Sequence, residues 1–210
     1  MEKHGLLIAG VGLPGIGKST LLRALAEMHG WQRLAEPEEP HWPASARDHK
    51  LSGVFTALTW FRAMRVANLY AADRLRQQGQ IGLIDCYYDK LMTHYIEAPQ
   101  MEWLIEPSDP YFDLVKHMAL VDNKRLPAAD IVILFTATFA SWEQCILSRK
   151  RQLDVERVFP GAFPFQGHLL QAAQLESENS STRFLIFENQ FGSIEHSVEQ
   201  LDALLATALS

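Results

Sequence analysis

The feature that most constrains this chain is a glycine-rich stretch at residues 12–19, which reads GLPGIGKS. Two glycines separated by four residues and followed by lysine and serine form the phosphate-binding P-loop pattern, also called Walker A. An apolar run at residues 6–11 precedes the pattern, and Lys18–His29 follow it with the apolar spacing of a helix. The sequence therefore predicts a strand, a phosphate loop and a helix in direct succession.

The residues of this loop are suited to holding a nucleoside triphosphate. Glycines let backbone N–H groups approach the phosphates, and the N-terminus of the helix adds its positive dipole. We expect Lys18 to reach the outer phosphates and the Ser19 hydroxyl to ligate magnesium. A glycine-rich turn without a ligand is the alternative, which the flanking strand and helix disfavour. The predicted cofactor-binding residues are Gly12, Pro14, Gly15, Ile16, Gly17, Lys18, Ser19 and Thr20.

Short apolar runs alternate with helical patterns along the rest of the chain. Further buried strands are expected at residues 32–35, 81–84, 131–135 and 184–187. Helices are expected at about 55–78, from a capping box of Ser141 and Gln144 to about Arg151, and at about 194–208. Two stretches with several prolines, 36–50 and 97–130, are expected to form loops or short helices. This alternation predicts an α/β fold with five parallel strands and helices on both faces.

Length and composition limit the class of protein. The 210 residues suit one domain over residues 1–210, and 48% hydrophobic residues suffice for a large core. A formal net charge of −6 argues against a nucleic-acid or anionic-membrane surface. No stretch approaches the roughly 20 apolar residues of a membrane span, and residues 6–11 are too short for a signal-peptide core. Two cysteines indicate a reducing compartment, so we expect a soluble cytoplasmic protein.

Two carboxylates follow predicted strands at the edge where parallel sheets bind ligands. Glu36 could be a general base for an acceptor hydroxyl, hold a sugar, or be a solvated carboxylate beside Glu38 and Glu39. Asp85 is expected to bind magnesium directly or through water, and capping the next helix is its alternative role. Together with the phosphate loop, these residues predict a reactive edge of the sheet.

Phosphoryl transfer also requires positive charge around the moving group. Four cations follow the predicted helix after the fourth strand, namely Arg149, Lys150, Arg151 and Arg157. One interpretation is a mobile basic lid at about 149–165, and the other is an exposed helix end with favourable cations. Arg62 and Arg65 lie three residues apart on the long helix, where they either meet an anion of the acceptor or face solvent.

Aromatic side chains could stack on a planar base, although each of them could equally belong to the core. These residues are Trp42, Trp60, Phe61, Tyr87, Tyr88 and Trp103. Cys86 beside Asp85 is interpreted as a small apolar filler rather than a reactive thiol. The histidines include no pair with the helical spacing of a zinc site.

Four segments together resemble the thymidylate kinase and deoxynucleoside kinase group of P-loop kinases. They read GLPGIGKST, AEPEEPHW, GLIDCYYDKLMTHY and ADIVILFTATFASWEQCILSRKRQLDVER, and they cover most of the chain in the order found in that group. The resemblance implies a three-layer P-loop NTPase sandwich with strand order 2-3-1-4-5. It also implies ATP with Mg²⁺ and often a homodimer formed through the long helices.

The resemblance carries over to individual positions. In the deoxynucleoside kinases a Glu-Pro pair supplies the catalytic base and a following Trp lines the nucleoside pocket, as Glu36 and Trp42 would. Asp85 matches the acid of an Asp-Arg or Glu-Arg pair, but Cys86 stands where the arginine is expected. Arg65 resembles the helix arginine that contacts the monophosphate in thymidylate kinases, which also carry an arginine where Ala35 stands here.

The leading hypothesis is an ATP-dependent kinase of a nucleoside or nucleoside monophosphate. The predicted catalytic residues are Lys18, Glu36, Asp85, Arg149 and Arg151; the substrate-binding residues are Glu36, Trp42, Arg65 and Tyr88; the magnesium ligands are Ser19 and Asp85. A kinase of another small metabolite is the second hypothesis, because the family arginine and a base-reading amide are missing. A nucleotide-binding regulatory protein with little turnover is the third.

Overall fold

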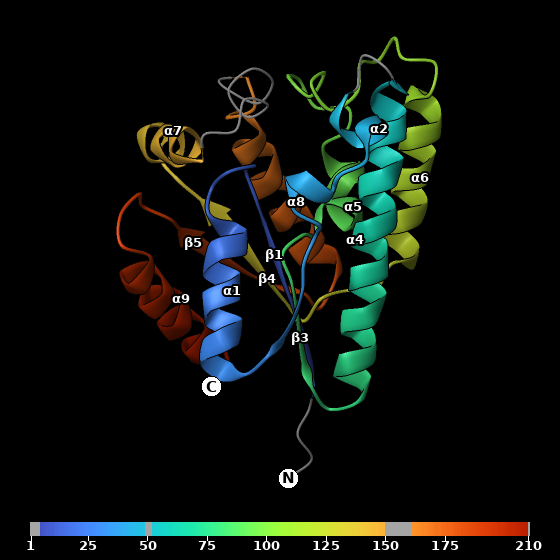
Figure 1. Cartoon of the computed structure of the whole chain (residues 1–210). Coiled ribbons are helices and arrows are strands. Elements are labelled where there is room, and N and C mark those ends of the chain that lie inside the picture. The colour runs from blue at the N-terminus through green and yellow to red at the C-terminus, as the bar shows by residue number, and fades with distance from the viewer. Residues whose placement is uncertain (1–4, 49–51, 150–160, 210) are drawn as a thin grey trace.

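The computed structural model describes residues 5–48, 52–149 and 161–209 of the chain. One sheet is formed by β1 (Leu6–Gly12), β2 (Gln32–Leu34), β3 (Ile81–Ile84), β4 (Ile131–Thr136) and β5 (Arg183–Glu188). Every neighbouring pair is parallel, and the order is β2-β3-β1-β4-β5 (Figure 1). The predicted sheet and the strand order implied by the resemblance are both confirmed.

Helices cover both faces of this sheet, which confirms the three-layer arrangement (Figure 1). On one face lie α1 (Lys18–His29) and α9 (Ile194–Leu209), which pack on each other. The other face carries α4 (Val54–Gln77) and α8 (Phe165–Asn179), with α5 (Tyr88–Leu91) and α6 (Phe112–Arg125) beside them. The remaining described helices are η1 (Glu39–His41), α2 (Ala44–Arg47), η2 (Met92–His94) and α7 (Phe139–Ser148).

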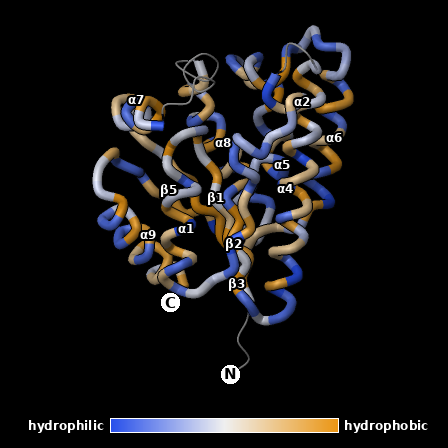
Figure 2. The backbone as a smooth tube through the Cα atoms, viewed as in Figure 1, coloured by the Kyte–Doolittle hydropathy of each residue, from blue (hydrophilic) through white to orange (hydrophobic). Residues whose placement is uncertain are grey.

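The core lies along the central strands because helices exclude water from both of their faces. All six residues of β4 are buried, as are all residues of β1 after Leu6. Figure 2 shows this as apolar colour concentrated in the strands, with hydrophilic residues on the outer turns of the helices. Gly82 in β3 allows α4 to approach closely, since a Cβ there would lie 2.9 Å from the backbone of Ala72. This approach packs β3 directly against α4.

Two expectations about helices are wrong. Residues 97–130 contain α6, a helix of 14 residues, where the sequence predicted only loops or short helices. The helix after β4 starts at Phe139 rather than at Ser141, because the Thr138 side chain accepts a hydrogen bond from the Ser141 backbone N–H at 3.2 Å. Ser141 is thus inside the first turn, and the helix ends at Ser148 rather than near Arg151.

Two further observations concern the class of protein. Both cysteines, Cys86 and Cys145, are free. Among the helices that the structure describes, none combines the length and the apolar character that a membrane crossing requires. Most of the predicted lid at 149–165, including Arg151, lies outside the described residues.

Candidate phosphoryl-transfer site

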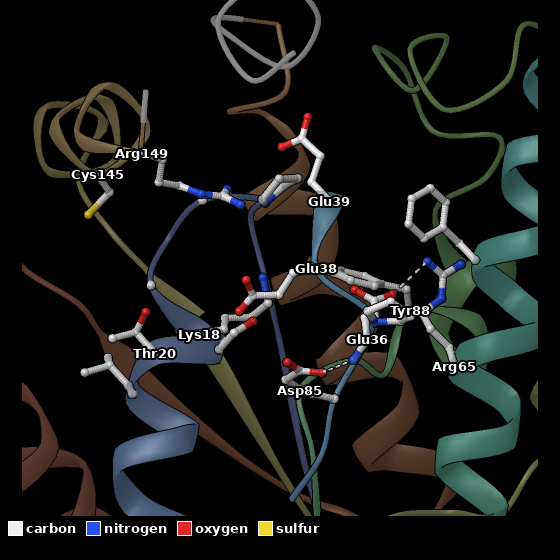
Figure 3. A pocket seen from close by; sticks show the side chains of 18 of the residues that line it. Lys18, Thr20, Glu36, Glu38, Glu39, Arg65, Asp85, Tyr88, Cys145 and Arg149 are labelled. Atoms are coloured by element: carbon white, nitrogen blue, oxygen red, sulfur yellow. Dashed lines mark hydrogen bonds and ion pairs between the residues drawn. The ribbon is translucent and has the colours of Figure 1, made fainter. Parts of the chain in front are cut away.

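A cavity of about 680 Å³ opens at the carboxyl ends of the strands. The loop between β1 and α1 forms one side, and side chains from α4, η2 and α8 form the other. Figure 3 shows Thr20 and Arg149 on the loop side, Arg65 and Tyr88 opposite, and Asp85 and Glu36 between them. The topology therefore gathers residues from distant parts of the sequence around one space.

Glycine is required at the two turns of the phosphate loop. Gly15 and Gly17 have φ angles of 78° and 96°, which side chains rarely adopt. A Cβ on Gly15 would also lie 2.3 Å from the Ile146 side chain and 3.0 Å from an Arg149 nitrogen. The loop is therefore packed directly beneath the C-terminal end of α7.

Side chains from distant elements hold the backbone of this loop. Trp142 Nε1 donates to the carbonyl of Pro14 at 2.8 Å, and Asn189 Nδ2 donates to the carbonyl of Ile16 at 2.7 Å. Because a phosphate site depends on fixed backbone dipoles, these two bonds prepare the loop before a ligand arrives.

The Lys18 side chain folds back onto the phosphate loop and contacts its backbone. Its Nζ donates to the carbonyls of Gly12 at 3.0 Å and Leu13 at 2.9 Å, and it lies 5.7 Å from the centre of the Tyr88 ring. The Tyr88 hydroxyl donates to the same Gly12 carbonyl. Burial lowers the pKa of Lys18 to about 8, although the carboxylates of Asp85 and Glu36 oppose that shift. A bound phosphate would supply a negative partner for this ammonium.

The predicted phosphate-binding residues divide into two groups. Pro14, Gly15, Gly17, Lys18, Ser19 and Thr20 line the cavity. The side chain of Ile16 is fully buried and anchors the loop from behind, and Gly12 is buried as the last residue of β1. The polar side chains that could contact a ligand are therefore those of Lys18, Ser19 and Thr20, at the end of the loop.

Asp85 is buried at the end of β3 and lines the cavity. Its Oδ2 accepts from Arg33 Nη1 at 3.2 Å and its Oδ1 accepts from the backbone N–H of Glu36 at 3.3 Å. It does not cap a helix, because α5 starts at Tyr88 and its cap residue is Tyr87. Arg33, which lies on β2, also lines the cavity and was not singled out from the sequence.

The oxygen donors at this edge suit a hard cation. No cluster of three or more acidic, histidine or cysteine side chains that could hold a metal occurs in the part of the chain that the structure describes. Magnesium does not require such a cluster, since one or two protein oxygens combine with phosphate oxygens and water. The exposed Ser19 hydroxyl and the Asp85 carboxylate are oxygen donors of this kind, and both line the cavity.

The Glu36 side chain is partly buried, with 29% of it exposed, and it lines the cavity rather than standing fully in solvent. Its Oε1 is buried and makes no hydrogen bond within the described residues, and Arg65 Nη1 lies 3.5 Å from it. Burial raises the pKa of Glu36 above its ordinary value, while Arg65 opposes this. A carboxylate with a raised pKa that faces a cavity is suited to accept a proton.

Neither Arg62 nor Arg65 faces only solvent. Arg62 forms two bonds to Asp122 on α6, at 2.6 and 2.5 Å. Arg65 forms two bonds to Asp89 on α5, at 2.6 and 3.1 Å, and it lines the cavity. Asp89 was also not singled out from the sequence.

Cys86 is buried behind these residues and does not line the main cavity. Burial and then Glu36 raise the pKa of its thiol well above the usual value, so the thiol stays neutral. This agrees with its interpretation as a filler. The cations of the cavity come from other positions, notably Arg33, Arg65 and Arg149.

The six aromatic residues considered for stacking differ in where they lie: some line the cavity and others do not. Trp42, Phe61, Tyr88 and Trp103 line the cavity. Trp42 packs edge-on against Phe61 at 4.9 Å, and its Nε1 donates to the carbonyl of Pro37. Tyr87 belongs to the core, where its hydroxyl accepts from the backbone N–H of Ala129, and Trp60 does not line the cavity.

Arg149 at the end of α7 lines the cavity beside the phosphate loop, whereas Arg151 lies outside the described residues. Asn189 is a further residue of the site that the sequence reasoning missed. A usable signal existed for it, because Asn189 directly follows β5 and thus lies at the same ligand-binding edge of the sheet as Asp85.

Solved structures similar to this chain show its fold. The deoxyadenosine kinase from M. mycoides with bound dATP matches with a TM-score of 0.66 and 18% identity, over 96% of this chain and 100% of that one. The thymidylate kinase from Candida albicans matches with a TM-score of 0.59 and 17% identity, over 98% of this chain and 92% of that one. The chain therefore has the fold of P-loop deoxynucleoside and thymidylate kinases.

Comparisons of the amino-acid sequence alone found no match. No protein-family model matches the chain, and no curated protein is significantly similar to it in sequence.

Proposed function

We propose that this chain is an ATP-dependent kinase that transfers the γ-phosphoryl group to a nucleoside or nucleoside monophosphate. The observation that carries the proposal is the cavity that joins a rigid phosphate loop to the partly buried Glu36 carboxylate and an aromatic wall. The neighbours with this fold include a deoxyadenosine kinase and a thymidylate kinase. A donor loop and a proton acceptor on one cavity suit transfer to an acceptor that attacks through a hydroxyl group.

In the proposed reaction an acceptor oxygen attacks the γ-phosphorus as the bond from that phosphorus to the β–γ bridging oxygen breaks. ADP leaves with the bridging oxygen, and Glu36 accepts the proton of an acceptor hydroxyl. Lys18 and Arg149 stabilise charge on the phosphates from the loop side. Ser19 and Asp85 would hold Mg²⁺, which would neutralise phosphate charge. Trp42 and Tyr88 would position the acceptor by stacking.

The test is ADP formation by the purified full-length chain with ATP, Mg²⁺ and a panel of nucleosides and nucleoside monophosphates. We expect at least one acceptor to stimulate ADP formation above the rate with water alone. The variant Lys18→Met should abolish that stimulation, because it removes the loop cation. The absence of stimulation by every member of the panel would refute the proposed acceptor class.

A kinase of a different alcohol is the second candidate. Among the described residues that line the cavity, the side-chain amides are Asn189 and Gln190, and Asn189 lies at the phosphate loop. The wall around Trp42, Phe61 and Trp103 thus offers stacking surface without an amide to read a base edge. Protection from thermal unfolding across a library of small alcohols would distinguish this candidate, since a ligand stabilises the protein that binds it.

A further inference from the structure

Arg65 is the cation on the acceptor wall of the cavity, but its charge is already balanced. Its guanidinium makes two bonds to Asp89, at 2.6 and 3.1 Å, and a third nitrogen lies 3.5 Å from Glu36 Oε1. The rings of Phe61 and Tyr88 flank it, each 5.8 Å from the guanidinium carbon. Two carboxylates share one guanidinium, so the group of Glu36, Arg65 and Asp89 carries one net negative charge when both acids are ionised.

The same group has an unfilled hydrogen-bonding position. Glu36 Oε1 is buried and accepts no hydrogen bond from the described residues. The Glu36 side chain as a whole is 29% exposed and lines the cavity, so the exposed part of its carboxylate can accept a hydrogen bond from a ligand that supplies a donor. An alcohol O–H is such a donor. A phosphate monoester near neutral pH presents mainly acceptor oxygens and up to about two negative charges, so it matches neither the open position nor the local charge.

The other cations that line the cavity are engaged or placed elsewhere. Arg33 pairs with Asp85 at 3.2 Å, and Lys18 and Arg149 lie at the phosphate loop. Arg23 and Arg47 also line the cavity, but both are exposed to solvent. Among the described residues, Arg65 is therefore the buried cation on the acceptor side that could meet a phosphate, and Asp89 determines whether it is available.

We infer that Asp89 is a specificity-determining residue: by holding Arg65, it favours acceptors that bring an uncharged hydroxyl, such as nucleosides, over acceptors that already carry a phosphate. This inference rests on the proposed kinase function, and it says which of the two proposed acceptor classes, nucleosides or nucleoside monophosphates, the site prefers. Asp89 does not line the main cavity, so it acts through Arg65 rather than by touching the acceptor.

The experiment compares the wild type with Asp89→Asn, using four deoxynucleosides and their 5′-monophosphates as matched acceptors. The isosteric change removes one negative charge and loosens the hold on Arg65. We expect wild-type kcat/KM to favour nucleosides, and the ratio of nucleoside to monophosphate kcat/KM to fall by about tenfold or more in Asp89→Asn. The shift should lie mainly in the KM of the monophosphate.

A matched control comes from the neighbouring ion pair. Asp122→Asn disturbs a two-bond pair with Arg62, three residues from Arg65 on the same helix, and neither Arg62 nor Asp122 lines the cavity. If the ion pairs serve only to join helices, both variants should alter thermal stability and leave acceptor preference alone. We expect Asp122→Asn to keep the wild-type ratio.

Binding provides a second readout that does not depend on turnover. Calorimetry with the donor loop saturated by a non-hydrolysable ATP analogue and Mg²⁺ should show nucleoside binding to the wild type and weaker monophosphate binding. Monophosphates that bind or react at least as well as nucleosides in the wild type would overturn the inference, as would an unchanged ratio in Asp89→Asn. Failure of every acceptor to stimulate ADP formation would instead refute the proposed function, while the binding ratio still decides the role of Asp89.

Discussion

Lys18 is buried, and in the proposed function its ammonium group must be positively charged to bind the phosphates of ATP. Its pKa of about 8 results from burial, and phosphate oxygens beside it would favour the protonated form. Below this pKa the ammonium is already protonated, so ATP binding needs no proton. Above it, binding must be accompanied by proton uptake, and affinity should fall by up to about tenfold for each pH unit.

Calorimetric titration with ATP in buffers of different ionisation enthalpy measures this uptake directly. We expect proton uptake to appear as the pH rises through about 8. Lys18→Arg keeps a cation whose pKa lies outside this range and should remove the pH dependence. ATP affinity that stays constant across this range in the wild type would contradict the burial argument.

Glu36 provides the second prediction at the residue scale. If it accepts the proton of the acceptor hydroxyl, Glu36→Gln should lower kcat by about 10²- to 10⁴-fold, while ATP binding changes little. Because burial raises the pKa of Glu36, the wild-type rate should fall with decreasing pH earlier than an ordinary carboxyl would require. The protonated form is inactive, so this acid limb should disappear in Glu36→Gln. An unaltered kcat would leave Glu36 a binding role only.

At the scale of elements, α7 illustrates how a helix start is decided by backbone conformation. Thr138 has extended φ and ψ angles of −67° and 156°, which place its oxygen near the N–H of Ser141. Thr138→Ala should therefore cost about 1 kcal/mol of unfolding free energy, whereas Ser141→Ala should cost much less. Denaturant unfolding of both variants measures the difference. A larger loss for Ser141→Ala would restore the capping box that the sequence suggested.

The elements that were predicted correctly are marked by local sequence features that do not depend on contacts with distant residues. The β3 strand at Ile81–Ile84 is a short apolar run bounded by polar residues, and α1 ends before Gly30, whose φ of 66° suits glycine. Helix α6 was missed for a physical reason. It buries Val115, Ala119 and Asp122 but exposes Leu114 and Leu120, so its apolar residues do not mark one face.

The candidate site was predictable to the extent that it follows from strand ends. The sequence placed Glu36 and Asp85 beyond the carboxyl ends of strands, and both do line the cavity there, as the topology of a parallel sheet leads one to expect. The partners of these residues were not predictable. Arg33 meets Asp85 across 52 positions of sequence and Asp89 meets Arg65 across 24, and no local pattern encodes such pairings.

At the scale of the whole molecule, the loop depends on elements from both halves of the chain. Trp142 and Asn189 reach it from α7 and from the end of β5, while Tyr88 reaches it from α5. A ligand on this loop is thus coupled to most of the sheet. If residues 1–210 form one domain, as the sequence predicts, unfolding should be a single cooperative transition.

Binding of ATP with Mg²⁺ should raise the temperature of this single unfolding transition. At about 100 times its dissociation constant, a ligand that binds only the folded state adds about 2.7 kcal/mol of stability. Scanning calorimetry should therefore show one peak that shifts entirely to higher temperature, and Lys18→Met should retain the peak but lose most of the shift. Two peaks, with only one of them responding to ATP, would show that the loop and part of the sheet unfold independently.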